Sequence, residues 1–109
     1  MEKNVTVIRA SEQPLIESTK SPLASRRLLA PETSGGAAGV SWIRLNGTHA
    51  AQNSGSGERF YYILSGSVVF DVEGEELRQA DAGDVVYMPK NRNYTFTGDI
   101  TYLYINITR

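Results

Sequence analysis

Short runs of β-branched and aromatic residues alternate with polar stretches along most of the chain. From Val40 to Leu45 apolar and polar side chains alternate, and the run stops at the turn dipeptide Asn46-Gly47. Further β-prone runs, separated by glycine, proline and polar turns, lie at residues 60–64, 68–72, 85–88, 94–96 and 101–108. No window of helical length shows a capped 3.6-residue apolar period. This pattern predicts an all-β protein, a sandwich or small barrel with almost no helix.

The N-terminal region differs from the rest of the chain. Residues 4–9 form a short β-prone run, and a polar stretch with Pro14 and Pro22 follows. We therefore expect an N-terminal strand and linker over residues 1–24 and a barrel over residues 25–109. An isolated strand needs a sheet to join, so the run at 4–9 also predicts a homodimer.

Composition indicates one ordinary globular domain. The 109 residues are 40% hydrophobic and 21% charged. Eleven basic and twelve acidic side chains give a formal net charge of -1, which provides no basis for a nucleic-acid partner. The chain start lacks the apolar region of a signal peptide, and no apolar run is long enough to span a membrane. We expect a cytoplasmic protein with neither a membrane nor a nucleic-acid partner.

The chain has no cysteine and a single histidine, His49. Disulfides, thiolate nucleophiles and cysteine-bearing zinc sites are therefore excluded within the chain. A metal site with two or more histidine ligands cannot be built from it either. We predict that the protein uses no metal and no other cofactor.

From Gly47 onward the chain resembles the cupin family. The first cupin motif is Gly, five residues, His-X-His, three or four residues, Glu, six residues and Gly; Gly47 and Gly66 stand at that spacing, around ERFYYILSG. The second motif is Gly, five residues, Pro-X-Gly, two residues and His; Gly83 and Pro89 fit it within AGDVVYMPKN. The resemblance covers residues 25–109. It implies a single jelly-roll barrel, a double-stranded β-helix, whose interior binds a small molecule.

The chain departs from the cupin motifs at the metal ligands. The two histidine positions of the first motif are Asn53 and Gly55, its glutamate position is Arg59, and the last histidine position is Tyr94. Shifting the alignment to use Glu58 recovers one ligand but no second histidine. A guanidinium is a permanent cation that would repel a divalent ion. The resemblance therefore implies a cupin pocket without the metal-dependent oxygenase, decarboxylase or isomerase chemistry of the family.

The residues near these positions are candidates for a binding site. Side chains alternate along a strand, so an inward Arg59 would bring Tyr61 into the barrel, and an inward Tyr94 would bring Phe96. Arg59 can clamp a carboxylate, a phosphate or a developing enolate, or it can pair with an internal carboxylate and be structural. Tyr61 and Tyr94 can donate protons to a leaving hydroxyl, or they can be core aromatics with satisfied hydroxyls.

Four further residues are candidates with two interpretations each. Histidine has an unperturbed pKa near neutrality, so His49 is the natural proton carrier, unless it is a surface residue. Asn53 can bind a sugar-like or amide ligand, or it is a turn residue. Trp42 and Arg44 share one strand face. If that face points inward they provide a stacking wall and a second cation, and if it points outward they belong to an interface.

These candidates support a metal-independent lyase, dehydratase or isomerase acting on a small polar metabolite with an anionic or carbonyl group. His49 would be the base, Arg59 the electron sink and a tyrosine the acid. Some small cupins of antibiotic and nucleoside pathways are metal-free dehydratases that use His and Tyr inside the barrel. This chain resembles them in length and in its Tyr-Tyr-X-X-Ser-Gly strand. The alternatives are a non-catalytic binding module or sensor, and a structural partner whose pocket is filled by side chains.

Overall fold

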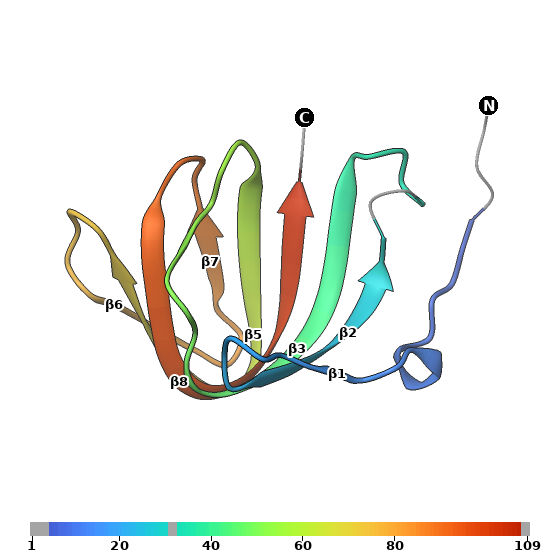
Figure 1. The fold of residues 1–109 in the computed structure, drawn as a ribbon, viewed down its shortest axis with the longest axis horizontal. Helices are drawn as coiled ribbons and strands as arrows, with labels where there is room; N and C mark the ends of the chain where they lie inside the picture. Colours follow the sequence, from blue (N-terminus) through green and yellow to red (C-terminus); the bar gives the residue numbers. More distant parts are fainter. Residues whose placement is uncertain (1–4, 31–32, 108–109) are drawn as a thin grey trace.

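The computed structural model describes residues 5–30 and 33–107, and within them it confirms the nearly all-β fold (Figure 1). Its 3-10 helix is η1 (Ala10–Glu12). Its strands are β1 (Ile16–Glu17), β2 (Leu23–Leu29), β3 (Ala38–Thr48), β4 (Gln52–Asn53), β5 (Glu58–Val72), β6 (Arg78–Asp81), β7 (Val85–Met88) and β8 (Asn93–Ile107).

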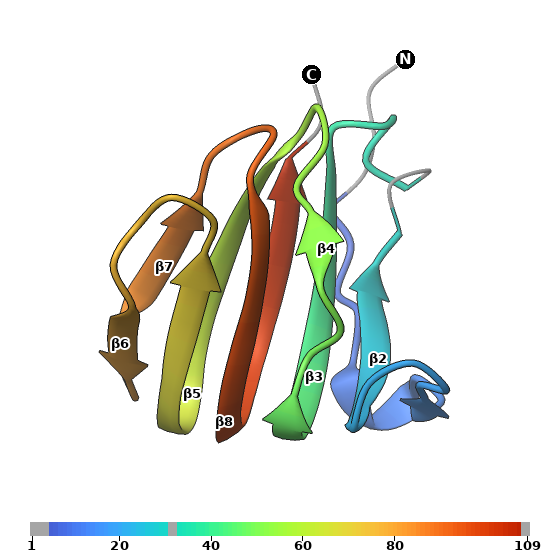
Figure 2. The same cartoon turned by 60° about the vertical axis from the view of Figure 1, so that its left-hand side comes forward.

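The strands form one curved antiparallel sheet in the order β1-β2-β3-β8-β5-β6, with β4 beside β8 and β7 beside β5. The long strands β5 and β8 pair along most of their lengths and bend, so that each contributes to both walls of the barrel (Figures 1 and 2). The first half of β5 pairs with β7 and its second half pairs with β6. We call the wall formed by β2, β3, the second half of β8, the first half of β5 and β7 the large sheet.

Inward-facing side chains from both walls fill the barrel. Aromatic rings dominate its centre: Phe70 stacks on Phe96 with centroids 4.6 Å apart, and Tyr61 packs edge-on against both. Burying such large side chains contributes much of the hydrophobic stabilisation of a small domain. The largest fully buried side chains are Tyr61, Tyr102, Phe70, Phe96, Leu45, Ile63, Ile100 and Val68.

Two pairs of predicted strands are each one continuous strand. The runs at 60–64 and 68–72 both belong to β5, and those at 94–96 and 101–108 belong to β8, apart from Thr108, which lies outside the described residues. Gly66 does not end β5. A glycine is needed here because the backbone of the neighbouring strand β8 lies too close to leave room for a side chain. It has a φ of +82°, and a Cβ atom at this position would lie 2.0 Å from the carbonyl oxygen of Asp99 on β8.

Replacing Gly66 with alanine should therefore destabilise the fold strongly. We expect the free energy of unfolding to fall by about 3 kcal/mol or more, because backbone must move in addition to the strain of a positive φ. Gly74 is the matched control: its φ is +83°, but no atom lies within 4 Å of its added Cβ. Gly74→Ala should cost only about 1 kcal/mol. Urea unfolding of both variants measures the difference, and equal losses would contradict the close approach to Asp99.

The predicted N-terminal strand does not form among the described residues of the single chain. Residues 5–9 lie in no strand, and Asn4 lies outside the described residues. The edge of β2 is already paired with β1, so this segment meets no free sheet edge at that position. Strand β2 also begins at Leu23, before the boundary predicted at residue 25. No helix among the described residues is long and apolar enough to cross a membrane.

Candidate active site

A cavity of about 130 Å³ lies inside the barrel against the inner faces of β3, β5 and β8. It is lined by Ile43, His49, Gln52, Arg59, Tyr61, Tyr102 and Tyr104. Four of these residues also line an outer groove of about 460 Å³, whose remaining lining is Ser18, Lys20, Ser21, Leu23, Ser25, Ser41, Ala50 and Ala51. The small cavity is therefore the inner end of a larger, hydroxyl-rich groove, and together they have a size typical of small-molecule sites.

Arg59 brings a positive charge into the cavity and has only uncharged partners. Its Nη1 atom donates to Gln52 Oε1 at 2.8 Å and to the Tyr94 hydroxyl at 3.0 Å. Its guanidinium lies 5.8 Å from the centroid of the Tyr104 ring. No ion pair joins Arg59 to a carboxylate among the described residues, and its Nε atom is buried without a partner. Burial by itself would lower the pKa of Arg59, but the hydrogen bond to Tyr94 and the nearby phenols raise the pKa by a larger amount. The net pKa of Arg59 is therefore above its ordinary value, and the side chain stays charged.

Two buried tyrosines continue this hydrogen-bond chain. The hydroxyls of Tyr61 and Tyr94 are hydrogen-bonded to each other, and Tyr61 lines the cavity. Burial raises the pKa of Tyr61 far above its ordinary value, and the neighbouring Tyr94 raises it further. Tyr61 is therefore a neutral phenol at any physiological pH. Because Tyr94 accepts from Arg59, it can donate to Tyr61, which leaves the Tyr61 hydrogen free for a ligand.

His49 stands where the inner cavity meets the outer groove. Its ring stacks on Phe96 with centroids 4.8 Å apart, and its backbone N–H donates to the Phe96 carbonyl at 2.8 Å. Its Nδ1 atom lies 2.7 Å from the carbonyl oxygen of Ala50, which can only accept, so Nδ1 carries the proton of the neutral ring. The unprotonated Nε2 atom is then available as a base. The amide nitrogen of Gln52 lies 3.3 Å from the same ring nitrogen, but two N–H donors cannot bond to each other, so Gln52 contacts the His49 ring while its only hydrogen bond named here is the one to Arg59.

The structure brings most of the predicted site residues together. His49, Arg59 and Tyr61 line one cavity, Tyr94 lies directly behind Tyr61, and Phe96 supports the ring of His49. Sequence reasoning missed Gln52, Tyr102 and Tyr104. The two tyrosines continue the alternation of Tyr94 and Phe96 along β8, so extending that pattern would have found them. Gln52 carries no comparable signal.

Four predicted binding residues do not line the cavity: Phe96 contacts it only through the ring of His49, and Asn53, Trp42 and Arg44 lie away from it. Asn53 is exposed and holds its own loop, since its amide nitrogen donates to Asn93 Oδ1 at 2.9 Å and its Oδ1 accepts from the Gly55 N–H at 2.6 Å. Trp42 and Arg44 alternate with the buried Ile43 and so face outward. Arg44 forms an ion pair with Asp99 at 2.5 Å, and the guanidinium of Arg26 on β2 lies 5.8 Å from the centroid of the Trp42 ring.

The donor set in the cavity does not fit a cupin metal. Among the described residues no group of three or more His, Cys, Asp or Glu side chains could hold a metal ion. The cavity offers one imidazole whose Nδ1 is bound to a carbonyl, one amide, three phenols and a guanidinium. The permanent positive charge of Arg59 lies in the same cavity as His49, which is the only imidazole there, and this charge opposes binding of a divalent metal ion.

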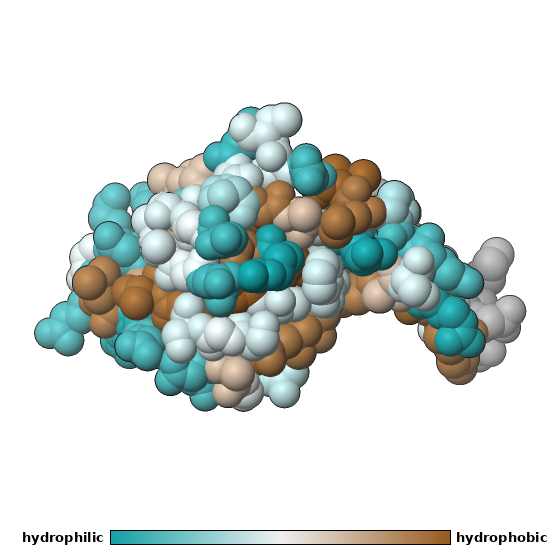
Figure 3. Space-filling model, turned by 90° about the horizontal axis from the view of Figure 1, so that it is seen from below, coloured by the Kyte–Doolittle hydropathy of each residue, from teal (hydrophilic) through white to brown (hydrophobic). Residues whose placement is uncertain are grey.

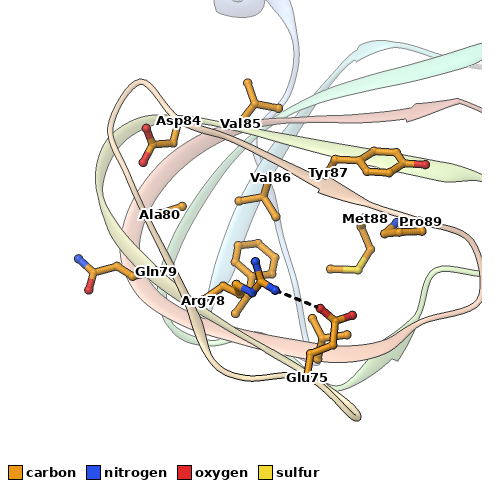
Figure 4. Close-up of a pocket in the computed structure, with 12 residues that line it drawn as sticks. Glu75, Arg78, Gln79, Ala80, Asp84, Val85, Val86, Tyr87, Met88 and Pro89 are labelled. Carbon is orange, nitrogen blue, oxygen red and sulfur yellow. Dashed lines mark ion pairs between the residues drawn. The ribbon is translucent and has the colours of Figure 1, made fainter.

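A larger cavity of about 500 Å³ lies elsewhere, between the unpaired edges of β6 and β7 (Figure 4). Val86 and Met88 point into it, whereas Val85 and Tyr87 point away. Its floor is apolar, and an ion pair between Glu75 and Arg78 at 3.9 Å spans its mouth (Figure 4). Its lining includes the carboxylates of Glu75 and Asp84 but no histidine, so its chemistry differs from that of the smaller cavity.

Comparison with known proteins identifies the family. A family model described as an EutQ-like cupin domain matches residues 37–102. The chain belongs to this cupin family. The resemblance inferred from the glycine and proline spacing is thereby confirmed. The comparison with curated proteins gives no significant match.

Solved structures of other cupins share the fold. A predicted oxalate decarboxylase from Thermotoga maritima is 22% identical with a TM-score of 0.84, over 95% of this cupin and 100% of that chain. Pac13, a nucleoside dehydratase from Streptomyces, is 18% identical with a TM-score of 0.75, over 95% of this cupin and 82% of that chain. KdgF from Halomonas sp. is 13% identical with a TM-score of 0.77, over 95% of each chain. Structural neighbours of this cupin therefore include enzymes.

Proposed function

We propose that this cupin is a metal-independent lyase of the dehydratase type that acts on a small polar metabolite with an anionic or carbonyl group. The observation that carries the proposal is the charged Arg59, which lies at a cavity with only neutral partners and a buried, unpartnered Nε atom. A half-buried cation without a counter-charge is stabilised by a ligand that supplies one. The nucleoside dehydratase Pac13 supports the reaction class, since its structures with uridine include variants in which a histidine or a tyrosine is replaced.

The reaction begins with proton removal by His49. The Nε2 atom takes a proton from the carbon next to the substrate carbonyl, and the electron pair moves onto the carbonyl oxygen. Arg59 stabilises the resulting enolate, because its N–H donors are fixed in position by Gln52 and Tyr94 before the substrate arrives. Hydrogen bonds from a preorganised cation to a developing oxyanion are among the larger catalytic effects available to a protein.

The second step expels the hydroxyl group at the neighbouring carbon. The enolate electron pair re-forms the carbonyl, a carbon–carbon double bond is made and the carbon–oxygen bond breaks. The raised pKa of Tyr61 makes it a poor proton donor, so we assign it the role of holding the leaving oxygen by a hydrogen bond. The proton that completes the water molecule comes from the imidazolium of His49. This assignment replaces the tyrosine acid expected from the sequence.

The outer groove fits the part of the substrate that does not react. Ser25 and Ser41 lie on the inner faces of β2 and β3, and Lys20 stands at the groove wall. Hydroxyl and ammonium groups suit a hydroxylated or anionic body. We therefore expect the acidic or carbonyl end of the substrate at Arg59 and its polar body in the groove.

A ligand screen with product analysis tests the proposal. Small hydroxy acids, hydroxy ketones and uridine would be screened by thermal shift, and each stabilising compound would be incubated with the protein and analysed for loss of water by mass spectrometry. Stabilisation together with water loss supports a dehydratase. Stabilisation without turnover for every compound would leave a binding module, and stabilisation that persists in Arg59→Ala would contradict the site.

We also expect the purified protein to function without a transition metal. The donor set around Arg59 opposes a divalent ion, so elemental analysis should show far less than one Fe, Mn, Ni or Zn per chain. Incubation with a chelator should leave both the melting temperature and ligand stabilisation unchanged. About one metal per chain, lost together with ligand binding on chelation, would contradict this expectation.

A further inference from the structure

The hydroxyl group of Tyr102 lies inside the barrel without a protein partner. The residue is 1% exposed, so it contributes almost nothing to the molecular surface, such as the face with hydrophilic residues at its centre in Figure 3. Among the described residues no hydrogen bond reaches this hydroxyl, whereas the hydroxyls of Tyr61 and Tyr94 are bonded to each other. Buried polar groups are almost always hydrogen-bonded, so an unpartnered hydroxyl at this depth indicates a binding role.

The neighbours of Tyr102 in the sheet do not explain the hydroxyl. Strand β8 lies between β3 and β5, and Tyr102 pairs with Ile43 on one side and Ile63 on the other. Its ring packs against the rings of Phe96 and Tyr61, with centroids 5.9 Å and 5.7 Å apart. A phenylalanine would make the same apolar and ring contacts without burying a hydroxyl. Core packing alone therefore gives no reason for a tyrosine at this position.

The hydroxyl opens onto the inner cavity. The unpartnered side-chain atoms that the described part of the chain encloses completely are Arg59 Nε and Asn106 Oδ1, and the Tyr102 hydroxyl is not one of them. The space that it reaches is the inner cavity, since Tyr102 lines this cavity and not the outer groove. A ligand group in the inner cavity can therefore meet this hydroxyl directly.

The inner cavity is small enough for its lining groups to contact the same ligand atoms. Its volume of about 130 Å³ is only about four times the ~30 Å³ that a water molecule occupies in the liquid. Arg59, Tyr61 and Tyr102 thus surround one small functional group. Burial and the neighbouring tyrosines raise the pKa of Tyr102 well above its ordinary value, so the hydroxyl keeps its hydrogen. Beside the positive charge of Arg59, a neutral phenol serves best as a donor to a negative oxygen.

We propose that Tyr102 is a further substrate-binding residue, which donates its hydroxyl hydrogen to the substrate oxygen held by Arg59. A carbonyl oxygen has two lone pairs and accepts from the guanidinium and the phenol together. The group bound at the inner end is then a carbonyl or a carboxylate, whose oxygens only accept, and not an amine or an alcohol. In the dehydration proposed above, on which this step rests, both hydrogen bonds strengthen as charge develops on the enolate oxygen.

Binding of pyruvate to Tyr102→Phe tests the role of the hydroxyl. The oxygens of pyruvate only accept, and pyruvate has no hydroxyl group to eliminate, so it measures binding without turnover. Isothermal titration should give a Kd about 10–100-fold higher for Tyr102→Phe than for the wild type, the loss expected for one hydrogen bond to a charged group. Tyr62→Phe is the matched control, because it removes a phenol hydroxyl from an exposed position of β5. It should leave the Kd unchanged.

Thermal melts without ligand separate a binding role from a structural one. Tyr102→Phe removes a hydroxyl that has no protein partner, so its melting temperature should equal or exceed that of the wild type. A melting temperature lowered by about 5 °C or more would show that the hydroxyl is bonded within the fold and would overturn the proposal. An unchanged Kd in Tyr102→Phe, or a wild type that does not bind pyruvate at millimolar concentration, would overturn it as well.

Failure of the proposed dehydratase has a different signature. If no screened hydroxy compound loses water but the Kd for pyruvate rises in Tyr102→Phe, the reaction is wrong and the binding role of Tyr102 stands. If a compound is dehydrated, Tyr102→Phe should lower its kcat by about 10²–10³-fold, the usual loss of one donor to a developing oxyanion. An unchanged kcat would overturn the contact between Tyr102 and the enolate.

Discussion

Arg59→Ala should weaken binding of an anionic ligand by about 2–5 kcal/mol, as truncating one side of a buried charge pair does. The structure gives the guanidinium no carboxylate partner among the described residues, so the charge on the ligand would be its only counter-ion. For the same reason the unliganded protein should lose little stability. The substitution removes two hydrogen bonds to neutral groups and also removes a desolvated charge. Isothermal titration and thermal melts, each with and without ligand, measure the two effects separately.

Two control variants sharpen this result. Arg44→Ala removes an arginine of the outer face that pairs with Asp99, and it should leave ligand affinity unchanged. Arg59→Lys keeps the charge but loses the planar fork of donors, so it should recover only part of the affinity. A large drop in the melting temperature of unliganded Arg59→Ala with intact ligand affinity would show that Arg59 is structural.

The fold could be predicted well because its signals are local. Glycine and proline spacing, alternation along 40–45 and the absence of helical periodicity all agree with a cupin barrel. The strand ends were harder, because Gly66 reads as a break in a sequence but serves here as a point of close backbone approach. The short strand β6 was missed, since only its pairing with β5 makes its polar sequence a strand.

Residues of the site could be predicted only where inward and outward side chains alternate regularly along a single strand. Arg59 with Tyr61, and Tyr94 with Phe96, were placed inward correctly by the period of two. The orientation of Trp42 could not be predicted, because its strand has apolar residues on both faces, Ile43 toward the core and Trp42 toward the outside of the sheet. Gln52 was missed because its position depends on the β4–β8 pairing, which sets it beside Tyr94.

His49→Gln should leave ligand affinity nearly unchanged and reduce turnover by about 10²–10⁴-fold, the usual contribution of a general base. Glutamine is similar in size and can still donate to the Ala50 carbonyl, but it cannot accept a proton from carbon at neutral pH. Isothermal titration and steady-state kinetics, with the screened compound that gives the most water loss, measure the two effects.

The contrast between the two substitutions separates a lyase from a sensor that uses the same cavity. In a lyase, Arg59→Ala acts on binding of substrate and enolate, whereas His49→Gln acts on turnover alone. In a sensor, His49→Gln changes nothing measurable, and Arg59→Ala still abolishes ligand stabilisation. If His49→Gln instead lowers the melting temperature as strongly as it lowers turnover, the ring serves mainly to pack on Phe96. The assignment of His49 as the base would then be wrong, while that of Arg59 would stand on its own measurement.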